Sequence, residues 1–280
     1  MKPETVDLKV HDYLYHYQSF DPTQSCARDR LKVIISDRRL YFSNPADFND
    51  PWDCRPYYDF SKISDPKVLD DHIERYIQFT KAQRPDICKI EWQWRAAVFK
   101  NNPKYFEEKL NKISRAMWEK IKETYRVYCL SLNSDAELMW AHYSNKHQGI
   151  CLEFRTRNEL MCSALKVDYQ KDYPNLDLTD PSEEENLKPL ITKSQVWKYE
   201  DEYRLIAREI GAALSDGTLT CVDNYVDLPD GALTGIIVGC MASKETVKAI
   251  RELVKCSKGQ IELLKAERAH DKYELTIVDI

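Results

Sequence analysis

The uneven distribution of helical and strand-like sequence along the chain is the feature that most constrains its fold. Residues 65–124 carry Lys, Glu, Ile, Phe and Trp at helical spacing, and their only prolines are Pro66, Pro85 and Pro103. This pattern predicts a block of three helices, broken near Pro85 and Pro103. Elsewhere short strand-like runs outnumber helices, so too few helices remain to separate the strands of a doubly wound sheet. The sequence therefore predicts an α+β fold, with a mainly antiparallel mixed sheet and a helical insertion.

The expected strands are short apolar or alternating runs bounded by turn residues. They cover residues 13–17, 40–43, 126–132, 149–154, 165–169, 199–206, 222–226, 235–239, 261–265 and 273–277. Outside the helical block, helices are expected over residues 23–36, about 186–192, and 243–254. A chain of 280 residues can bury one large core. We therefore expect one domain over residues 1–280, with the helical insertion at about 65–124.

The charge balance excludes some classes of partner. The formal net charge of -5 and the pI near 5.8 arise from well-mixed charges, which do not form the overall basic surface that holds nucleic-acid backbones. A local basic groove is still compatible with the sequence. No apolar run approaches the roughly 18 residues of a membrane span, and the first residues lack the apolar core of a signal peptide. We expect a soluble, cytoplasmic protein without a membrane partner.

Several familiar cofactor sites are also excluded by the sequence. The nine cysteines include no CxxC pair, so neither a zinc ribbon nor a disulfide scaffold is expected, and the thiols should be reduced. Glycine occurs only seven times, and neither GxGxxG nor GxxxxGKS/T is present. Rossmann-type and P-loop nucleotide binding are therefore not expected.

A charged run that becomes apolar, at residues 197–206, is the first candidate for chemistry. If Tyr199–Ile206 is extended, Glu200, Glu202 and Arg204 share one face of the strand. Two carboxylates and a guanidinium are costly to bury unless they pair with each other or meet a polar ligand. The alternative is an exposed edge strand whose charged face is solvated.

Three further segments place polar and aromatic residues where a plain core would use aliphatic ones. They are the strand that contains His16, the loop Asn49-Asp50-Pro51, and residues 139–149 with His142 and His147. The loop could form the polar wall of a pocket. The alternative is that its Asx residues and proline only form a turn. A metal site made of the two histidines and Asp50 is one alternative. The other is that one histidine bonds to backbone while its neighbour faces solvent, and we assign no metal.

These segments together resemble the pattern of the bacterial domain-of-unknown-function family 2971, in order and spacing over nearly the whole chain. The motifs are Leu14-Tyr15-His16-Tyr17, Leu40-Tyr41-Phe42-Ser43, Phe48-Asn49-Asp50-Pro51-Trp52-Asp53, Met139-Trp140-Ala141-His142-Tyr143 with His147 and Gly149, and Tyr199-Glu200-Asp201-Glu202-Tyr203-Arg204. Residues 235–239 resemble a further signature of the family. The resemblance implies no established activity, but family members are similar to proteins found near mobile and phage-defence genes.

The order of motifs is also similar to that of ADP-ribosyltransferases, including the DNA-modifying toxin group. In that fold a first-strand His or Arg holds the NAD ribose, a second-strand Tyr or Ser packs on nicotinamide, and a late-strand Glu acts at the reacting ribose. The resemblance gives these roles to His16, to Tyr41 or Ser43, and to Glu202 or Glu200. The loop at residues 49–51, the segment 140–143 and the long helical insertion are not part of the usual transferase pattern.

The transferase resemblance implies NAD as the substrate, and an oxocarbenium-like transition state that Glu202 would stabilise. Glu200 would orient or deprotonate the acceptor, which would be a nucleic acid or a protein. The residues expected to bind the nucleotide are Tyr17, Tyr41, Ser43, Asn49, Asp50, Trp140, His142, Tyr143 and Arg204.

Three functional hypotheses follow from the sequence. The first is an NAD-using ADP-ribosyltransferase-like enzyme, acting as a toxin or phage-defence effector. The second is a nucleotide-binding or sensing module without turnover. The third is a metal-dependent hydrolase or nuclease that uses Asp50, His142, His147 and Glu202.

Overall fold

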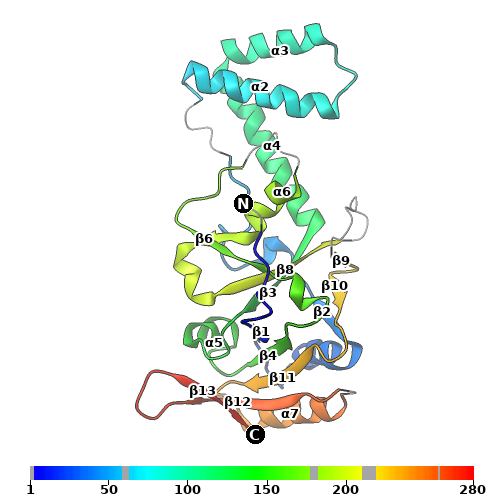
Figure 1. Ribbon diagram of the computed structural model, residues 1–280, viewed down its shortest axis with the longest axis vertical. Coiled ribbons are helices and arrows are strands. Elements are labelled where there is room, and N and C mark those ends of the chain that lie inside the picture. The colour runs from blue at the N-terminus through cyan, green and yellow to red at the C-terminus, as the bar shows by residue number, and fades with distance from the viewer. Residues whose placement is uncertain (1–2, 59–62, 177–181, 210–218, 258) are drawn as a thin grey trace. The chain divides into compact units, whose positions relative to one another are not determined.

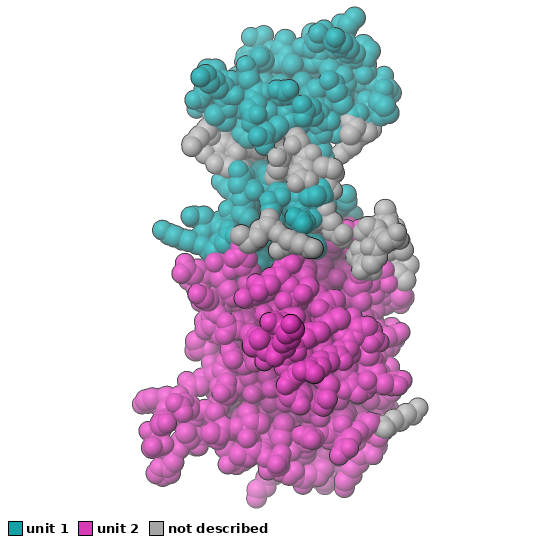
Figure 2. Space-filling model, viewed as in Figure 1, with its two compact units in different colours: residues 1–2, 50–123, 170–194 teal, residues 3–49, 124–169, 195–280 magenta. Residues whose placement is uncertain are grey.

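The computed structural model describes residues 3–58, 63–176, 182–209, 219–257 and 259–280 (Figure 1). The chain divides into two compact units, which Figure 2 shows in different colours. The first unit includes Asp50–Glu123 and Gln170–Ser194, and the second consists of Pro3–Asn49, Thr124–Tyr169 and Gln195–Ile280. The sequence predicts one domain with an insertion at about 65–124, and that insertion lies in the first unit.

The helical insertion of the first unit contains the three predicted helices, α2 (Pro66–Gln83), α3 (Lys89–Asn101) and α4 (Pro103–Thr124). Asp65 caps α2, because its side chain accepts hydrogen bonds from the backbone of the first turn, and Pro66 occupies the first helical position. The three helices share a core that consists of Ile63, Leu69, Ile73, Phe99, Phe106 and Leu110. This core makes the insertion a packed helical structure in its own right.

A fourth helix of this unit, α6 (Glu183–Ile191), precedes strand β7 (Thr192–Ser194). The sequence predicts this helix from about residue 186. It begins earlier because the Ser182 hydroxyl accepts a hydrogen bond from the Glu185 amide at 3.2 Å and caps the first turn.

The second unit is built on a nine-stranded sheet, in the order β13-β12-β11-β4-β1-β3-β8-β5, with β9 paired to β8. All neighbouring pairs are antiparallel except β11 with β12 and β8 with β9. The α+β fold with a mixed, mainly antiparallel sheet is therefore confirmed. In chain order the strands are β1 (Tyr13–Gln18), β3 (Tyr125–Ser131), β4 (Ile150–Arg155), β5 (Leu165–Lys166), β8 (Glu202–Glu209), β9 (Thr220–Cys221), β11 (Leu233–Val238), β12 (Glu262–Arg268) and β13 (Leu275–Asp279).

The two faces of this sheet are covered by different elements. On one face, α1 (Ser25–Lys32), the π-helical turn that follows it (Val33–Asp37) and α7 (Lys244–Lys255) contribute to the largest core. On the other face, α5 (Glu137–Tyr143) packs Met139 and Trp140 into a smaller core with Tyr17, Cys151 and Ile237. Side chains alternate between the faces along each strand, so the strand register determines which residues meet on either side.

Two predicted strands are corrected by the structure. The segment 199–206 is not one strand, because residues Gln195–Glu200 form a 3-10 helix and Asp201 has a left-handed φ of 42°, so β8 begins at Glu202. The predicted strand 222–226 is interrupted by a tight turn at Asp223 and Asn224, which have φ of 52° and 67°, and its last two residues belong to β10 (Tyr225–Asp227). Asx residues tolerate this backbone conformation, which explains why the turn contains no glycine.

The remaining differences are small. The predicted helix at 23–36 is α1 continued by the π-helical turn, and it ends at Arg38 with a left-handed φ of 51°. Strand β2 (Arg39–Tyr41) pairs with β10 apart from the large sheet, and β6 covers Asp168–Gln170. All nine cysteines are free. Among the described residues, no helix combines the length and the apolar character that crossing a membrane requires.

Candidate functional site

A row of polar side chains crosses the sheet on the face that carries α5. Glu153 of β4 is paired with Gly235 of β11 on one side and with Tyr15 of β1 on the other. Tyr15 is paired in turn with Ser131 of β3, and Ser131 with Glu202 of β8. Directly paired residues of neighbouring strands place their side chains on the same face. We call Gly235, Glu153, Tyr15, Ser131 and Glu202 the polar row; its Glu153 and Tyr15 are partly exposed, whereas Ser131 and Glu202 are buried.

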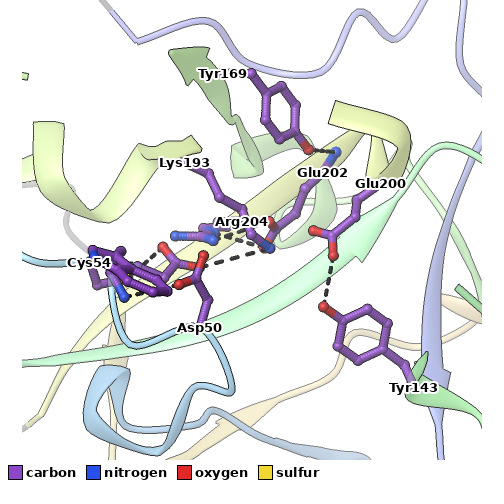
Figure 3. Close-up of polar contacts among 10 residues, drawn as sticks. Asp50, Cys54, Tyr143, Tyr169, Lys193, Glu200, Glu202 and Arg204 are labelled. Atoms are coloured by element: carbon purple, nitrogen blue, oxygen red, sulfur yellow. Dashed lines mark hydrogen bonds and ion pairs between the residues drawn. The ribbon is translucent and has the colours of Figure 1, made fainter. Parts of the chain in front are cut away.

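The buried end of the polar row is held by an ion pair within β8. Arg204 donates from Nε to Glu202 Oε1 at 2.8 Å and from Nη2 to Glu202 Oε2 at 3.0 Å (Figure 3). The two residues are two apart in a strand, so they lie on the same face, as the sequence predicts for this pair. Their exposed fractions are 3% for Glu202 and 0% for Arg204. The guanidinium also lies over the Phe48 ring, 5.5 Å from its centroid, so the charge is enclosed by a carboxylate and an aromatic face.

Glu200 reaches the same region from outside the strand. Its Oε1 accepts a hydrogen bond from the Tyr143 hydroxyl at 2.7 Å (Figure 3), and its backbone carbonyl accepts one from Ser131 Oγ at 2.7 Å. The side chain is almost fully buried. The prediction that Glu200 shares a strand face with Glu202 and Arg204 is wrong, because the left-handed backbone at Asp201 separates it from β8. The Tyr143 contact nevertheless ties α5 to the start of β8.

The exposed end of the polar row holds a carboxyl group with an altered pKa. Thr234 Oγ1 donates to Glu153 Oε1 at 2.8 Å. Burial raises the pKa of Glu153, and the charge of Glu262 adds to this, whereas hydrogen bonds from Thr234 and Tyr15 oppose it. Burial, followed by the charge of Glu153, raises the pKa of Tyr15 to about 12. Gly235 leaves room for this carboxyl, since a Cβ there would lie 3.2 Å from Glu153 Oε1.

The comparisons with known proteins bear on this same part of the sheet. Residues 139–205 match the family model described as a protein of unknown function, DUF2971. The predicted resemblance to DUF2971 is confirmed over this segment. No curated protein and no solved structure is significantly similar to the chain.

The DUF2971 segment, residues 139–205, brings together most of the contacts described above. It contains both partners of the Tyr143–Glu200 hydrogen bond, both partners of the Glu202–Arg204 ion pair, and Glu153. Residues 14–17, 40–53 and 235–239, which also carry the resemblance, lie outside the matched segment. The matched sequence thus covers the part of the fold in which α5, β4 and β8 supply polar side chains.

Within the DUF2971 segment, Trp140 and His142 have different surroundings. Trp140 is fully buried and donates from Nε1 to the carbonyl of Ser134 at 2.8 Å, so it acts as a core residue. His142 is exposed, and its ring lies 6.4 Å from that of Trp197 and 6.5 Å from that of Tyr199. These rings form an aromatic group beside Tyr143. His147 follows in a left-handed turn with φ of 66°.

A metal centre finds no support in the described part of the chain. No group of three His, Cys, Asp or Glu side chains there is arranged to hold a metal ion. Asp50, which the metal hypothesis requires, accepts a hydrogen bond from the backbone of Trp52 at 2.9 Å and is buried. Asp50 therefore stabilises a turn, which is the second interpretation that the sequence allows for this loop.

His16 lies on the opposite face of the sheet from the polar row. It alternates with Tyr15 and Tyr17 along β1, and its ring stacks on Tyr128 at 4.2 Å in the largest core region. Its Nδ1–H donates to the carbonyl of Cys129 at 2.8 Å. Burial lowers the pKa of His16 to about 4, against the smaller effect of that hydrogen bond. The structure therefore does not bring His16 together with Glu202, and this pairing, which the transferase resemblance implies, is corrected.

The remaining predicted residues are dispersed over the second unit. Tyr17 is on the polar-row face, but it is buried against Trp140, with ring centroids 5.2 Å apart, and its hydroxyl donates to the Asn133 carbonyl at 2.7 Å. Tyr41 is exposed and its ring meets that of Tyr225. Ser43 pairs through its backbone with Val127 of β3, and Asn49 is exposed.

The sequence does not identify three members of the polar row as site residues: Tyr15, Ser131 and Glu153. Glu153 had a detectable signal, because it is the one charged residue inside the apolar run Ile150–Phe154. Tyr15 is flanked by Tyr13 and Tyr17 at the spacing of one strand face. Ser131 has no signal of its own, since a serine at a strand end is common in turns.

Proposed function

We propose that the protein is an NAD-using ADP-ribosyltransferase-like enzyme, a cytoplasmic toxin or phage-defence effector that modifies a nucleic acid or a protein. The observation that supports this most is the adjacency of β1, β3 and β8, on which Tyr15, Ser131 and Glu202 are paired directly. The transferase resemblance calls for a first-strand side chain, a hydroxyl from another strand and a late-strand glutamate around one ribose. The polar row offers these three groups on one face.

This proposal reassigns two of the roles. His16 is on the other face of β1, so Tyr15 takes its role as the first-strand group that bonds the ribose. Ser131 takes the role first given to Tyr41 or Ser43, because Tyr41 belongs to the separate β2–β10 pair. Glu202 keeps its role as the late-strand carboxylate.

The chemistry requires a negative charge beside a developing cation. When the bond between ribose and nicotinamide breaks, its electron pair leaves with nicotinamide and the ribose carbon becomes an oxocarbenium-like cation. Arg204 holds Glu202 as a carboxylate, which would stabilise that cation. An acceptor nucleophile then bonds to the ribose carbon and gives up its proton, for which Glu200, held by Tyr143, is the base.

The second candidate is a nucleotide-binding module without turnover. A specific observation favours it: both carboxylate oxygens of Glu202 are bonded to Arg204, and only 3% of the residue is exposed. A glutamate buried in this way can stabilise the sheet, while the partly exposed Tyr15 and Glu153 and the exposed His142 contact the ligand.

Nicotinamide release separates the two candidates. Purified protein is incubated with NAD and a mixture of nucleic acid and protein acceptors, and free nicotinamide is measured by chromatography. The enzyme proposal expects turnover that is lost in Glu202→Gln and retained in Glu108→Gln, an exposed glutamate of α4 that serves as a matched control. Saturable NAD binding without turnover would instead support the binding module. Turnover that appears only with added divalent metal would support the hydrolase hypothesis.

Neighbouring residues of β1 provide a second, matched pair of variants. Tyr15→Phe removes a hydroxyl from the polar-row face, and His16→Asn changes the opposite face while retaining a donor for the Cys129 carbonyl. We expect Tyr15→Phe to weaken NAD binding or turnover and His16→Asn to leave both unchanged in folded protein. The reverse result would restore His16 to the site and contradict the reassignment.

A further inference from the structure

A cleft on the second unit lies between α5 and the hairpin of β12 and β13. It has a volume of about 370 Å³ and is lined by residues 135–138, Tyr199 and residues 273–275. Residues 135–138 include the start of α5, and residues 273–275 end at the first residue of β13, whose hairpin is red in Figure 1. No residue of this cleft belongs to the polar row, so the two features are separate.

The walls of the cleft are aromatic and aliphatic. Tyr199 and Tyr273 contribute rings, and Ala136, Leu138 and Leu275 contribute apolar side chains. Tyr273 is 98% exposed and Leu138 50% exposed, although both are large hydrophobic residues that folding would normally cover. The exposed Tyr273 ring and the partly exposed Tyr199 ring are therefore available to a ligand.

The rim of the cleft is acidic. Asp135, Glu137 and Glu274 line it, and all three are exposed. Glu274 is near Lys272, with Nζ and Oε2 3.9 Å apart, but no ion pair involves Asp135 or Glu137 anywhere in the described ranges. The negative charge of the rim is therefore only partly balanced by the chain itself.

The cleft is continuous with a free edge of the sheet. Leu275, which lines the cleft, is the first residue of β13, and β13 is the terminal strand of the nine-stranded sheet among the described residues. An extended peptide can add to such an edge through backbone hydrogen bonds, while its alternate side chains enter neighbouring hollows. A small free cation would gain nothing from this edge.

We propose that this cleft is a docking site for an extended, basic segment of a partner protein, which pairs with β13 and places an arginine side chain between Tyr199 and Tyr273. The guanidinium stacks on the tyrosine rings and pairs with Asp135 and Glu137. The aliphatic part of the arginine contacts Leu138. The binding site is independent of the proposed enzyme activity.

Fluorescence anisotropy with a defined peptide tests the proposal. The probe is a labelled, N-acetylated hexapeptide of alternating arginine and valine, and its matched control carries citrulline, which keeps the shape of arginine without the charge. We expect the citrulline peptide to bind about tenfold more weakly, and the arginine peptide to lose affinity as salt rises from about 50 to about 300 mM. Equal binding of the two peptides would refute the proposal.

Variants of the protein locate the binding. Asp135→Asn with Glu137→Gln removes two charges of the rim, and we expect about tenfold weaker binding of the arginine peptide. The control is Glu107→Gln with Glu108→Gln, two exposed glutamates of α4, which should leave the affinity unchanged. Tyr273→Ala, at a side chain too exposed to affect folding, should also weaken binding.

Two results would overturn the proposal at this stage. One is equal loss of affinity in the rim variant and the α4 control, which would indicate unspecific charge attraction. The other is that spermidine, tested by competition, binds as tightly as the arginine peptide. This result would indicate a site for small cations in which β13 has no role.

Discussion

Replacement of Arg204 by methionine would remove the guanidinium that pairs with the buried carboxylate of Glu202. Glu202 is 3% exposed, so water cannot replace the two hydrogen bonds, of 2.8 and 3.0 Å, that Arg204 donates. Hydrogen bonds to charged groups contribute about 1.5–3 kcal/mol each, and removal of one member of a buried ion pair costs about 3–5 kcal/mol. We therefore expect Arg204→Met to lower the free energy of unfolding of the second unit by about 3–5 kcal/mol. This loss corresponds to a decrease of about 6–20 °C in melting temperature for a unit of this size.

Urea denaturation at 25 °C, followed by circular dichroism and tryptophan fluorescence, measures this loss. The matched control is Arg155→Met, an exposed arginine of β4, which should change stability by no more than about 0.5 kcal/mol. Addition of Glu202→Gln to Arg204→Met removes the carboxylate that has lost the guanidinium, and we expect it to recover a substantial part of the stability. A loss below about 1 kcal/mol for Arg204→Met, or no recovery in the double variant, would show that the pair is not desolvated and would refute the reasoning.

Two further predictions concern His16 and Gly239. Burial lowers the pKa of His16 to about 4 from an ordinary value of 6.5, so unfolding takes up a proton between these pH values. We expect stability to fall by at most about 3 kcal/mol as the pH decreases from 6.5 to 4, and His16→Asn to remove this component of the pH profile measured by urea denaturation. An equal pH profile in the variant would contradict the burial of the neutral ring. For Gly239→Ala, the new Cβ would lie 2.1 Å from the backbone carbonyl oxygen of His147, which already accepts a hydrogen bond from Met241, so we expect a loss above about 4 kcal/mol. The control is Gly231→Ala: alanine at the φ of 71° found there costs about 1–2 kcal/mol, and the new Cβ meets no atom within 4 Å. A smaller loss for Gly239→Ala than for Gly231→Ala would show that the turn at Gly239 can relax.

Local patterns predict most of the elements because each depends on a few neighbouring residues. The spacing of prolines around Pro85 and Pro103 separates α2, α3 and α4, and Ser243 caps α7 as its sequence indicates. The prediction fails where the backbone changes direction without glycine or proline. Asp201, Asp223 and Asn224 adopt left-handed conformations that their residue types permit but do not require. The strand predicted at 199–206 therefore begins too early, and the one predicted at 222–226 is interrupted by a turn.

In the candidate site, too, the sequence predicts local features correctly but not the contacts between distant segments. Alternation along β8 is a local property, so the sequence predicts that Glu202 and Arg204 share a face. Which face of β1 meets that pair depends on strand order and register, and these place Tyr15 rather than His16 opposite Ser131. A shift of one residue in the pairing would exchange the two.

By itself the sequence determined the class of fold, the position of the helical insertion and the similarity of residues 139–205 to DUF2971, because composition, periodicity and motif order are properties of the linear chain. Only the tertiary structure decided which of these motifs meet. Glu153, Tyr15, Ser131 and Glu202 come from four strands that are far apart in the chain, and hydrogen bonds between the strands align them in one row. Residues so distant in sequence influence one another only after the sheet has formed, and therefore their meeting leaves no local pattern to read.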